Sequence, residues 1–244
     1  MTPMLDVRHA SKLFGGVHAL EDVSFTLNAG EVVALAGDNG AGKSTLIKII
    51  AGVHKASVGE VLFDGKPIGF ASPRDARDAG IETIYQDLAL AENLDVPANI
   101  FLGRELVTRR FGLFPVLDRP TMRQAAETAL NSLDIHTSLD RPVRDLSGGQ
   151  RQAVAIGRAI YWNARLLIMD EPTAALGVPE QRKVIELIHR LRDRGVGVLF
   201  ISHNLGDIFA VSDRIIVLRR GIKAGERQAS ETNGDEIVRL MVGA

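Results

Sequence analysis

Apolar runs and helically spaced apolar positions alternate along most of this chain. Val32–Ala36 is a continuous apolar run, typical of a strand buried on both faces of a sheet. Leu46, Ile47 and Ile50 then follow helical spacing, and Gly52 can end that helix in a left-handed conformation. The alternation returns in strands expected over 166–169, 196–202 and 215–218, and in helices over 150–161 and 184–191. It predicts an α/β fold whose mainly parallel core sheet is covered by helices on both faces.

Two segments depart from this alternation. The first part of the chain has short, hairpin-like strands, with a helix and a further strand after them, expected over Leu5–Val7, Val23–Leu27, Glu31–Ala36, Val58–Phe63, Arg74–Ala79 and Ile81–Tyr85. We expect an N-terminal antiparallel β subdomain there. Residues 87–145 are interpreted as a mostly helical insertion, because apolar residues from Met122 to Leu133 share one helical face. Thr121 and Gln124 fit a capping box at the start of that helix.

Composition narrows the function classes. The formal net charge of −1 argues against a dominant nucleic-acid surface, and the absence of cysteine excludes disulfides. No apolar run is long enough for a membrane helix, and the N-terminus lacks the long apolar stretch of a secretory signal. We therefore expect a soluble cytoplasmic protein that could still bind a membrane protein.

A glycine-rich loop follows the strand Val32–Ala36. The stretch Gly37–Ser44 reads GDNGAGKS and fits the phosphate-loop pattern G-x-x-x-x-G-K-[ST]. Its glycines allow positive φ, so that backbone N–H groups and the helix N-terminus can surround phosphates. Lys43 would reach the β- and γ-phosphates of a nucleotide, and Ser44 would ligate Mg²⁺. The alternative is a chance glycine turn, which the strand–loop–helix context disfavours.

Two carboxylates end a later apolar strand, Leu166–Met169. Asp170 and Glu171 lie where open α/β sheets bind ligands, at the carboxyl end of a central strand. Asp170 would hold Mg²⁺ through water, and Glu171 would orient or deprotonate an attacking water. An isolated Asp-Glu pair more often begins a solvated loop, and the phosphate loop is what favours the catalytic interpretation.

A second glycine-containing motif is Leu146–Gln150, which reads LSGGQ. Ser147 and Gln150 fit a capping box at a helix start, but capping does not explain Gly148 and Gly149. Two glycines expose N–H groups at the positive end of a helix, which suits a γ-phosphate. Capping and phosphate binding are compatible.

At these residues the chain resembles the ATP-binding cassette (ABC) transporter family over nearly its whole length. Gly37–Thr45 matches the phosphate loop, Leu146–Gln150 the family signature and Leu166–Glu171 the Walker B strand; Gln86, His203 and Phe14 match the Q-loop, switch histidine and adenine-stacking aromatic. The resemblance implies a P-loop NTPase that binds ATP and Mg²⁺. It implies one domain over 1–244, with a nucleotide-binding core at 1–86 and 160–244 and a helical signature subdomain at 87–159.

The resemblance also assigns roles to single residues. Catalysis would rest on Lys43, Glu171 and His203, and Mg²⁺ would be held by Ser44, Gln86 and Asp170. Nucleotide contacts would come from Phe14, Gly37, Asn39, Gly40, Ala41, Gly42, Lys43, Ser44, Thr45, Gln86 and Asp170. In a head-to-tail dimer the partner chain would add its signature, that is, Ser147, Gly148, Gly149 and Gln150. Each of three residues has an alternative when it is taken singly: His203 could be structural, Phe14 could be ordinary core, and Gln86 could be a solvated strand end.

One position departs from the family pattern, because Gly177 stands where many members have aspartate. The segments 174–178 and 99–105 resemble those of bacterial monosaccharide importers, of the single-cassette type that works as a homodimer. The implied partners are membrane permease subunits, contacted around Leu88–Glu105, and indirectly a solute-binding protein. The implied location is the cytoplasmic face of the bacterial inner membrane. Import of another small solute, a non-transport cassette ATPase acting on DNA or ribosomes, and a phosphotransferase are the alternatives.

The segment Val107–Leu117 carries Phe111, Leu113 and Phe114. These apolar side chains could extend a docking surface for the permease. Packing inside the helical insertion explains them equally well.

Overall fold

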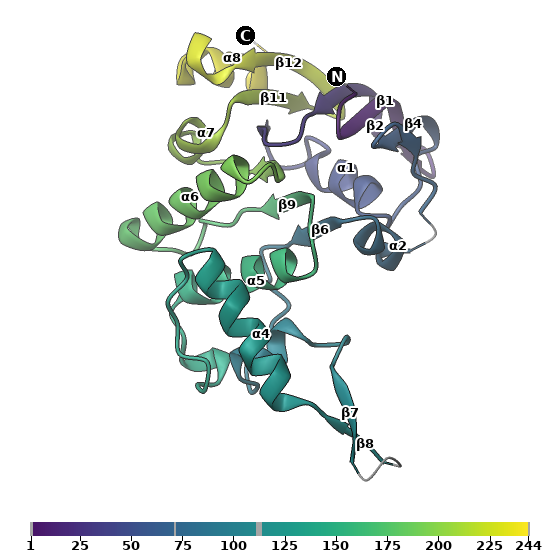
Figure 1. Cartoon of the computed structure of the whole chain (residues 1–244). Coiled ribbons are helices and arrows are strands. Elements are labelled where there is room, and N and C mark those ends of the chain that lie inside the picture. The colour runs from purple at the N-terminus through teal and green to yellow at the C-terminus, as the bar shows by residue number, and fades with distance from the viewer. Residues whose placement is uncertain (1, 71, 111–113, 244) are drawn as a thin grey trace. The chain divides into compact units, whose positions relative to one another are not determined.

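The structure is a computed structural model that describes residues 2–70, 72–110 and 114–243 (Figure 1). It contains two compact units. The core unit consists of Met1–Gln86, Ala164–Ala174 and Ile188–Ala244, and the insertion unit of Asp87–Asn163 and Ala175–Leu187. Each unit is described by itself below. In the described part of the chain, no helix is both long and apolar enough to cross a membrane.

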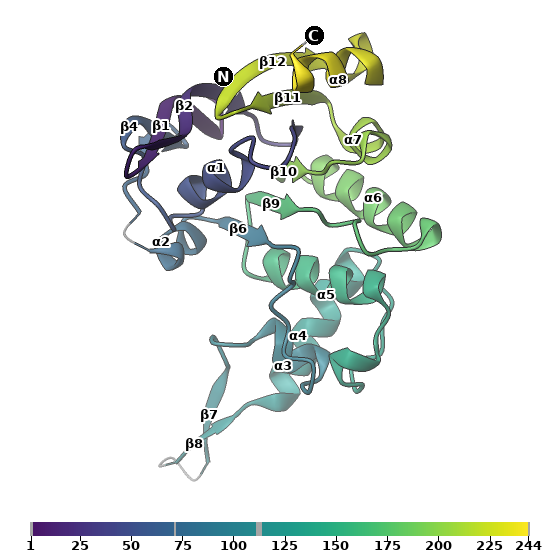
Figure 2. The same cartoon turned by 180° about the vertical axis from the view of Figure 1, so that it is seen from behind.

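A six-stranded sheet forms the centre of the core unit, in the order β12-β11-β3-β10-β9-β6. Its members are β3 (Val32–Ala36), β6 (Ile81–Ile84), β9 (Leu166–Asp170), β10 (Gly197–Ile201), β11 (Arg214–Arg219) and β12 (Ile222–Gln228). All neighbouring pairs are parallel except β11 and β12, which form an antiparallel pair at one edge (Figure 2). Every residue of β3 and β10 is buried, as expected for strands covered on both faces. The predicted α/β fold with a mainly parallel sheet is confirmed.

An antiparallel sheet of four strands, in the order β2-β1-β4-β5, completes the β-structure of the core unit. The strands are β1 (Leu5–Phe14), β2 (Val17–Leu27), β4 (Val58–Phe63) and β5 (Lys66–Pro67). β1 and β2 are much longer than the apolar runs that predicted them, because the added part of each strand mixes buried residues with exposed ones of both polar and apolar type. The N-terminal antiparallel β subdomain is confirmed.

The helices of the core unit begin and end at recognisable local signals. They are α1 (Lys43–Ile50), α2 (Pro73–Asp78), α7 (Leu205–Val211) and α8 (Gly234–Val242), with a short 3₁₀ turn at Ala229–Glu231. α1 ends as predicted, since Gly52 has φ +72° and its N–H donates to the Ile49 carbonyl while the Val53 N–H donates to that of Lys48. α8 packs along β11 and β12. α6 (Val178–Asp193) has residues in both units.

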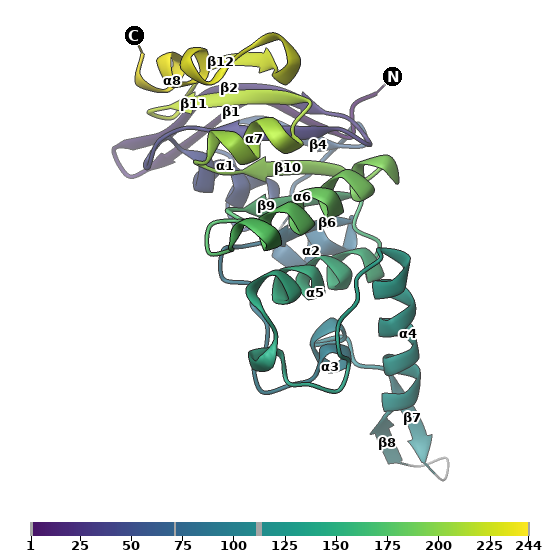
Figure 3. The same cartoon turned by 90° about the vertical axis from the view of Figure 1, so that its left-hand side faces the viewer.

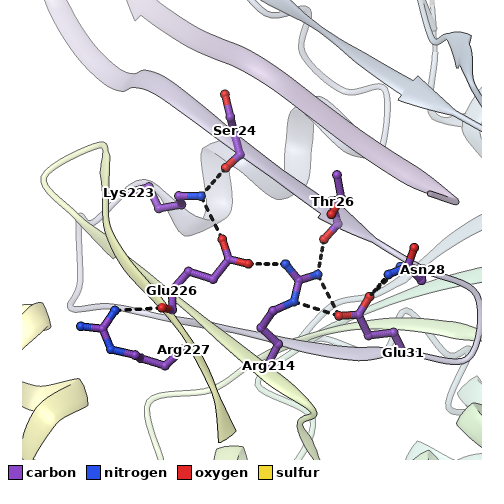
Figure 4. A network of polar contacts seen from close by, with 8 residues as sticks. All are labelled: Ser24, Thr26, Asn28, Glu31, Arg214, Lys223, Glu226 and Arg227. Atoms are coloured by element: carbon purple, nitrogen blue, oxygen red, sulfur yellow. Dashed lines mark hydrogen bonds and ion pairs between the residues drawn. The ribbon is translucent and has the colours of Figure 1, made fainter. Parts of the chain in front are cut away.

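A polar network joins the two sheets of the core unit (Figure 4). The Arg214 guanidinium on β11 pairs with Glu31, which precedes β3, and with Glu226 on β12. It also donates to the Thr26 carbonyl on β2 at 2.6 Å, and Lys223 Nζ donates to the Ser24 carbonyl at 2.7 Å. These bonds fix the position of the antiparallel sheet relative to the β11–β12 side of the six-stranded sheet.

The insertion unit is helical with one hairpin (Figure 3). Its elements are α3 (Val96–Ile100), β7 (Val107–Arg110), β8 (Phe114–Leu117), α4 (Arg119–Ser132), a 3₁₀ turn at Val143–Asp145 and α5 (Gly148–Tyr161). The capping box expected at Thr121 is wrong, because α4 begins earlier and its N-cap is Asp118, whose carboxylate accepts from the Thr121 N–H. The aspartate outcompetes Thr121 because the helix starts at Arg119-Pro120, where proline suits the first turn.

Candidate functional site

The glycine-rich loop connects β3 to α1 with backbone angles that favour glycine. Gly37, Gly40 and Gly42 have φ of +150°, +81° and +104°. A Cβ at Gly37 would lie 2.4 Å from the Leu218 carbonyl oxygen, and one at Gly42 would lie 2.9 Å from that of Ala19. The loop therefore lies tightly against β11 and the start of β2, and no residue with a side chain would fit at these two glycine positions. Between them, Asn39 and Gly40 are exposed and Ala41 is buried.

The N-terminus of α1 is open to an anion. Its N-cap is Gly42, with no side-chain cap hydrogen bond, and its first turn contains no acidic residue. Lys43 Nζ donates to the carbonyls of Gly37 at 2.6 Å and Asp38 at 3.1 Å, so the ammonium lies across the loop. Ser44 and Thr45 occupy the first turn of α1. Uncapped N–H groups, the helix dipole and a lysine together form a cationic cradle rich in hydrogen-bond donors, as a phosphate requires.

Two acids lie at the carboxyl end of β9. Burial raises the pKa of Asp170; the charge of Glu171 raises it further, and those of Lys43 and Lys48 oppose the rise. Glu171 has φ +52°, an uncommon conformation for a residue with a side chain, and its N–H donates to the Ile201 carbonyl at 2.9 Å. Asp170 thus carries an electrostatic penalty that a bound cation would relieve.

His203 and Glu171 are brought together because β9 and β10 are parallel neighbours that end at the same edge of the sheet. His203 Nδ1 lies 2.9 Å from Glu171 Oε2. The Glu171 side chain is 16% exposed and that of His203 is 73% exposed, so the pair consists of a shielded carboxylate and an accessible imidazole. The geometry suits a carboxylate that accepts a proton beside an imidazole that contacts a ligand.

Three further residues at this edge were missed from the sequence. The buried Ser202 hydroxyl lies 3.5 Å from Glu171 Oε2 and accepts from the Asn204 N–H. Thr173 and Asp207, both buried, are joined by a 2.6 Å hydrogen bond from the threonine hydroxyl to the carboxylate. This bond ties the turn after Glu171 to helix α7, which follows His203. Both residues stand within four positions of a predicted catalytic residue, and that proximity is the only signal that could have identified them.

Gln86 and Phe14 lie at strand ends of the core unit. Gln86 is exposed two residues beyond β6. The pKa of its neighbour Tyr85 is raised overall. Burial and the charge of Asp170 raise it, and a hydrogen bond with Thr83 partly offsets the rise. Phe14 at the end of β1 is 45% exposed; its ring meets that of His54 edge-on at 5.3 Å, and Lys12 Nζ lies 5.2 Å from its centroid. Phe14 thus has an accessible aromatic surface.

The LSGGQ motif lies in the insertion unit, at the start of α5. The predicted capping box is present: Ser147 Oγ accepts from the Gln150 N–H at 3.3 Å, and Gln150 Oε1 accepts from the Ser147 N–H at 2.9 Å. A Cβ at Gly148 would lie 2.7 Å from Leu176 Cδ2, and one at Gly149 would lie 3.1 Å from Glu180 Cβ. Close packing by the start of α6 therefore also requires small residues here.

Gly177 directly precedes α6. Its N–H donates to Glu180 Oε2 at 3.3 Å, and its carbonyl accepts from the Glu180 N–H. A Cβ at this position would meet only ordinary contacts, at 3.7 and 3.8 Å, and φ is not in the left-handed region. The local backbone therefore accommodates an aspartate at position 177.

Substituting asparagine for Asp170 should raise the unfolding temperature of the protein without nucleotide or Mg²⁺ at neutral pH. A raised folded-state pKa means that ionisation of Asp170 opposes folding, so wild-type stability falls as pH rises above the unfolded value of about 3.9. The gain should shrink as the pH falls toward the unfolded value, because the carboxyl is then protonated in the folded state and increasingly so in the unfolded state. Thermal unfolding of Asp170→Asn and wild type from pH 4 to 8 measures this. A gain that stays constant with pH would contradict the electrostatic cause.

Comparisons with known proteins agree with this geometry. The sequence model described as "ABC transporter" matches residues 20–174. The xylose/arabinose import ATP-binding protein of Sulfolobus acidocaldarius is 50% identical, covering 99% of this chain and 94% of its own. The fructose import ATP-binding protein of Rhizobium meliloti is 45% identical, with 99% and 95% covered. The ribose import ATP-binding protein of Hahella chejuensis is 44% identical, and this chain spans 48% of its length.

Solved cassettes share the fold. The ADP conformation of an ATP-binding cassette of an ABC transporter superposes with a TM-score of 0.86 at 27% identity, with both chains fully covered. A dimeric bacterial ABC transporter cassette superposes with a TM-score of 0.76 at 26% identity, over 93% of this chain and 99% of its own.

Proposed function

Since this chain belongs to the ABC transporter family, we propose that it hydrolyses ATP to power the import of a monosaccharide. The observation that carries the proposal is the Glu171–His203 pair. This pair follows the carboxyl ends of β9 and β10, and the phosphate loop follows the carboxyl end of their parallel neighbour β3. A phosphate loop alone binds nucleotides; a shielded carboxylate paired with an accessible imidazole at the same edge supports hydrolysis.

ATP would occupy the loop Gly37–Thr45, with its triphosphate on the N–H groups of the loop and of α1. Lys43 would exchange its hydrogen bonds to the Gly37 and Asp38 carbonyls for the β- and γ-phosphates. The adenine would stack on the exposed ring of Phe14, a contact worth roughly 1–3 kcal/mol. The loop presents hydrogen-bond donors to the triphosphate, and Phe14 presents an open aromatic surface to the adenine.

Ser44, Gln86 and Asp170 fit Mg²⁺, because they offer only oxygen ligands, which this ion prefers. Burial and the charge of Glu171 raise the pKa of Asp170, and a bound cation would oppose that rise. When bound, Mg²⁺ would neutralise charge on the phosphates. Glu171 would accept a proton from the attacking water, and His203 would contact the γ-phosphate.

The signature residues Ser147, Gly148, Gly149 and Gln150 would act on the ATP of a second copy, in a head-to-tail homodimer. Support comes from the distribution of motifs: the phosphate loop belongs to the core unit, and the signature caps a helix of the insertion unit. The proposed division is a nucleotide-binding core at 1–86 and 160–244 and a signature subdomain at 87–159. Closure of the dimer would drive membrane permease subunits at the cytoplasmic face of the cell membrane, and a solute-binding protein would deliver the sugar to them.

Light scattering of the purified chain tests the dimer. Glu171→Gln should change from monomer to dimer when ATP is added, because the nucleotide is held without being consumed. A matched double variant, Glu171→Gln with Ser147→Arg, should stay monomeric while still binding ATP. A Glu171→Gln chain that binds ATP and stays monomeric would exclude dimer closure as a property of the chain itself.

Uptake by cells tests the substrate. Disrupting the gene should abolish uptake of one labelled sugar among xylose, arabinose, ribose and fructose, and leave amino-acid uptake unchanged. The wild-type chain should restore uptake and Glu171→Gln should not. Normal uptake of all four sugars in the disrupted strain would contradict the proposed import of these monosaccharides.

A further inference from the structure

The hairpin β7–β8 exposes apolar side chains on both of its faces. Val107, Phe114, Val116 and Leu117 are 64%, 68%, 37% and 48% exposed. The strands pair antiparallel and project from the start of α4 (Figures 1 and 3). Packing of Phe114 inside the insertion, one of the two alternatives from the sequence, is therefore wrong; Phe111 and Leu113 lie outside the described residues.

The register determines which side chains share a face. Val107 lies opposite Leu117, and Val116 lies opposite Thr108 with Phe114 two residues before it on the same face. An isolated two-stranded ribbon is at best marginally stable in water, so exposed apolar residues on both faces call for a covering partner. A flat protein surface covers one face of such a ribbon, whereas a lipid phase surrounds both.

The positive charge near the hairpin favours a lipid surface with anionic headgroups. Residues 104–123 contain five arginines against two acids, Glu105 and Asp118, in a chain whose net charge is −1. Two of the five have partners within the insertion unit, since Arg123 pairs with Asp140 and Arg104 lies over the Trp162 ring. Arg109 is exposed on β7 and Arg119 is exposed just after β8. An apolar element flanked by arginines complements a bilayer with anionic headgroups.

We propose that the β7–β8 hairpin is a lipid-contacting element that lies in the headgroup region of an anionic membrane. Its apolar side chains enter the boundary with the acyl chains, and the exposed Arg109 and Arg119 contact lipid phosphates. The unpaired backbone groups on the outer edge of each strand stay in the hydrated headgroup layer, since the hydrocarbon core does not tolerate open sheet edges. This contact is independent of nucleotide and separate from any contact with a permease.

The chain contains no cysteine, which permits a single-site probe. Phe114→Cys carrying an environment-sensitive fluorophore should shift to the blue with vesicles of equal parts phosphatidylglycerol and phosphatidylcholine, and not with phosphatidylcholine alone. The control is the same fluorophore on Val242→Cys, at a valine that is 61% exposed near the end of α8. It should show no shift.

Vesicle flotation of unlabelled protein measures affinity. Arg109→Glu should weaken binding to the anionic vesicles by about fivefold for each unit of charge lost. The combined change Val107→Ser, Phe114→Ser and Val116→Ser should weaken it by roughly tenfold or more. Arg182→Glu, which makes the same charge change on the exposed face of α6, should float as wild type does. ATP affinity and unfolding temperature serve as folding controls for every variant.

Unchanged flotation of the hairpin variants, or equal binding to neutral and anionic vesicles, would overturn the proposal. So would hairpin variants that float normally but no longer assemble with a permease, because the hairpin would then be a protein contact. A failure of sugar import leaves these vesicle results untouched, since they involve neither ATP nor transport.

Discussion

Replacing Glu171 with glutamine should reduce ATP hydrolysis by about 10²–10⁴-fold, the range expected when a general base is lost. Glutamine keeps the size of the side chain and can still hydrogen-bond His203 at the observed 2.9 Å, but it cannot accept a proton from water. The affinity for ATP should stay within a few-fold of wild type, because Lys43 and the loop N–H groups that bind phosphate are unchanged. Steady-state phosphate release and nucleotide titration on the same preparation separate the two effects.

Glu60→Gln is the matched control for this substitution. Glu60 is an exposed acid on β4 that pairs with Arg8, far in sequence from the catalytic edge, and its amide should hydrolyse ATP at the wild-type rate. His203→Ala should also lose hydrolysis, since it removes both the ligand contact and the partner of Glu171. If Glu171→Gln hydrolyses ATP within threefold of wild type, the general base is another group and the Glu171–His203 pair is structural.

Features that depend on a few neighbouring residues could be predicted from the sequence. The strand before the phosphate loop, the left-handed end of α1 at Gly52 and the capping box of Ser147 and Gln150 are confirmed. Each is a local arrangement in which spacing and residue type determine the backbone. The roles of the site residues stay predictions, although Glu171 and His203 do lie together as a shared catalytic role requires.

Features that depend on long-range pairing could not be predicted. β12 is polar along most of its length and was missed, because its stability comes from β11 rather than from an apolar pattern. The β7–β8 hairpin was hidden inside a segment interpreted as mostly helical. Arg214 and Glu31 meet across 183 positions of sequence, and no local pattern indicates that pairing.

The Arg214 network carries the largest expected effect on stability. Arg214→Met should lower the free energy of unfolding by about 3 kcal/mol, the lower end of the range for breaking a buried ion pair, because Arg214 and its partners are half-buried. The methionine leaves Glu31 and Glu226, whose side chains are 16% and 28% exposed, without the guanidinium, and it leaves the Thr26 carbonyl without its donor. Urea unfolding at pH 7 measures the loss. Arg8→Met is the matched control: Arg8 also bridges two acids, Asp6 and Glu60, but it is exposed, and its loss should change stability little.

The pH dependence of the same pair distinguishes lost charge pairing from lost packing. Burial acts to raise the pKa of Glu226, but hydrogen bonds and charge from Lys223 and Arg214 outweigh it and lower the pKa below 4.5. A carboxylate with a lowered folded-state pKa stabilises the protein fully above its unfolded value, and that contribution is lost as pH falls through the lowered pKa. Wild-type stability should therefore fall on acidification below about pH 4.5, the range in which an unfolded glutamate takes up its proton. In Arg214→Met, Glu226 keeps its burial and its pair with Lys223 but loses its second cationic partner, so the difference from wild type should shrink as the carboxyl is protonated. A difference that is the same at pH 4 and pH 7 would mean that Arg214 stabilises the joint between the sheets through contacts that do not depend on the carboxylate, namely the packing of its aliphatic part and its hydrogen bond to the Thr26 carbonyl.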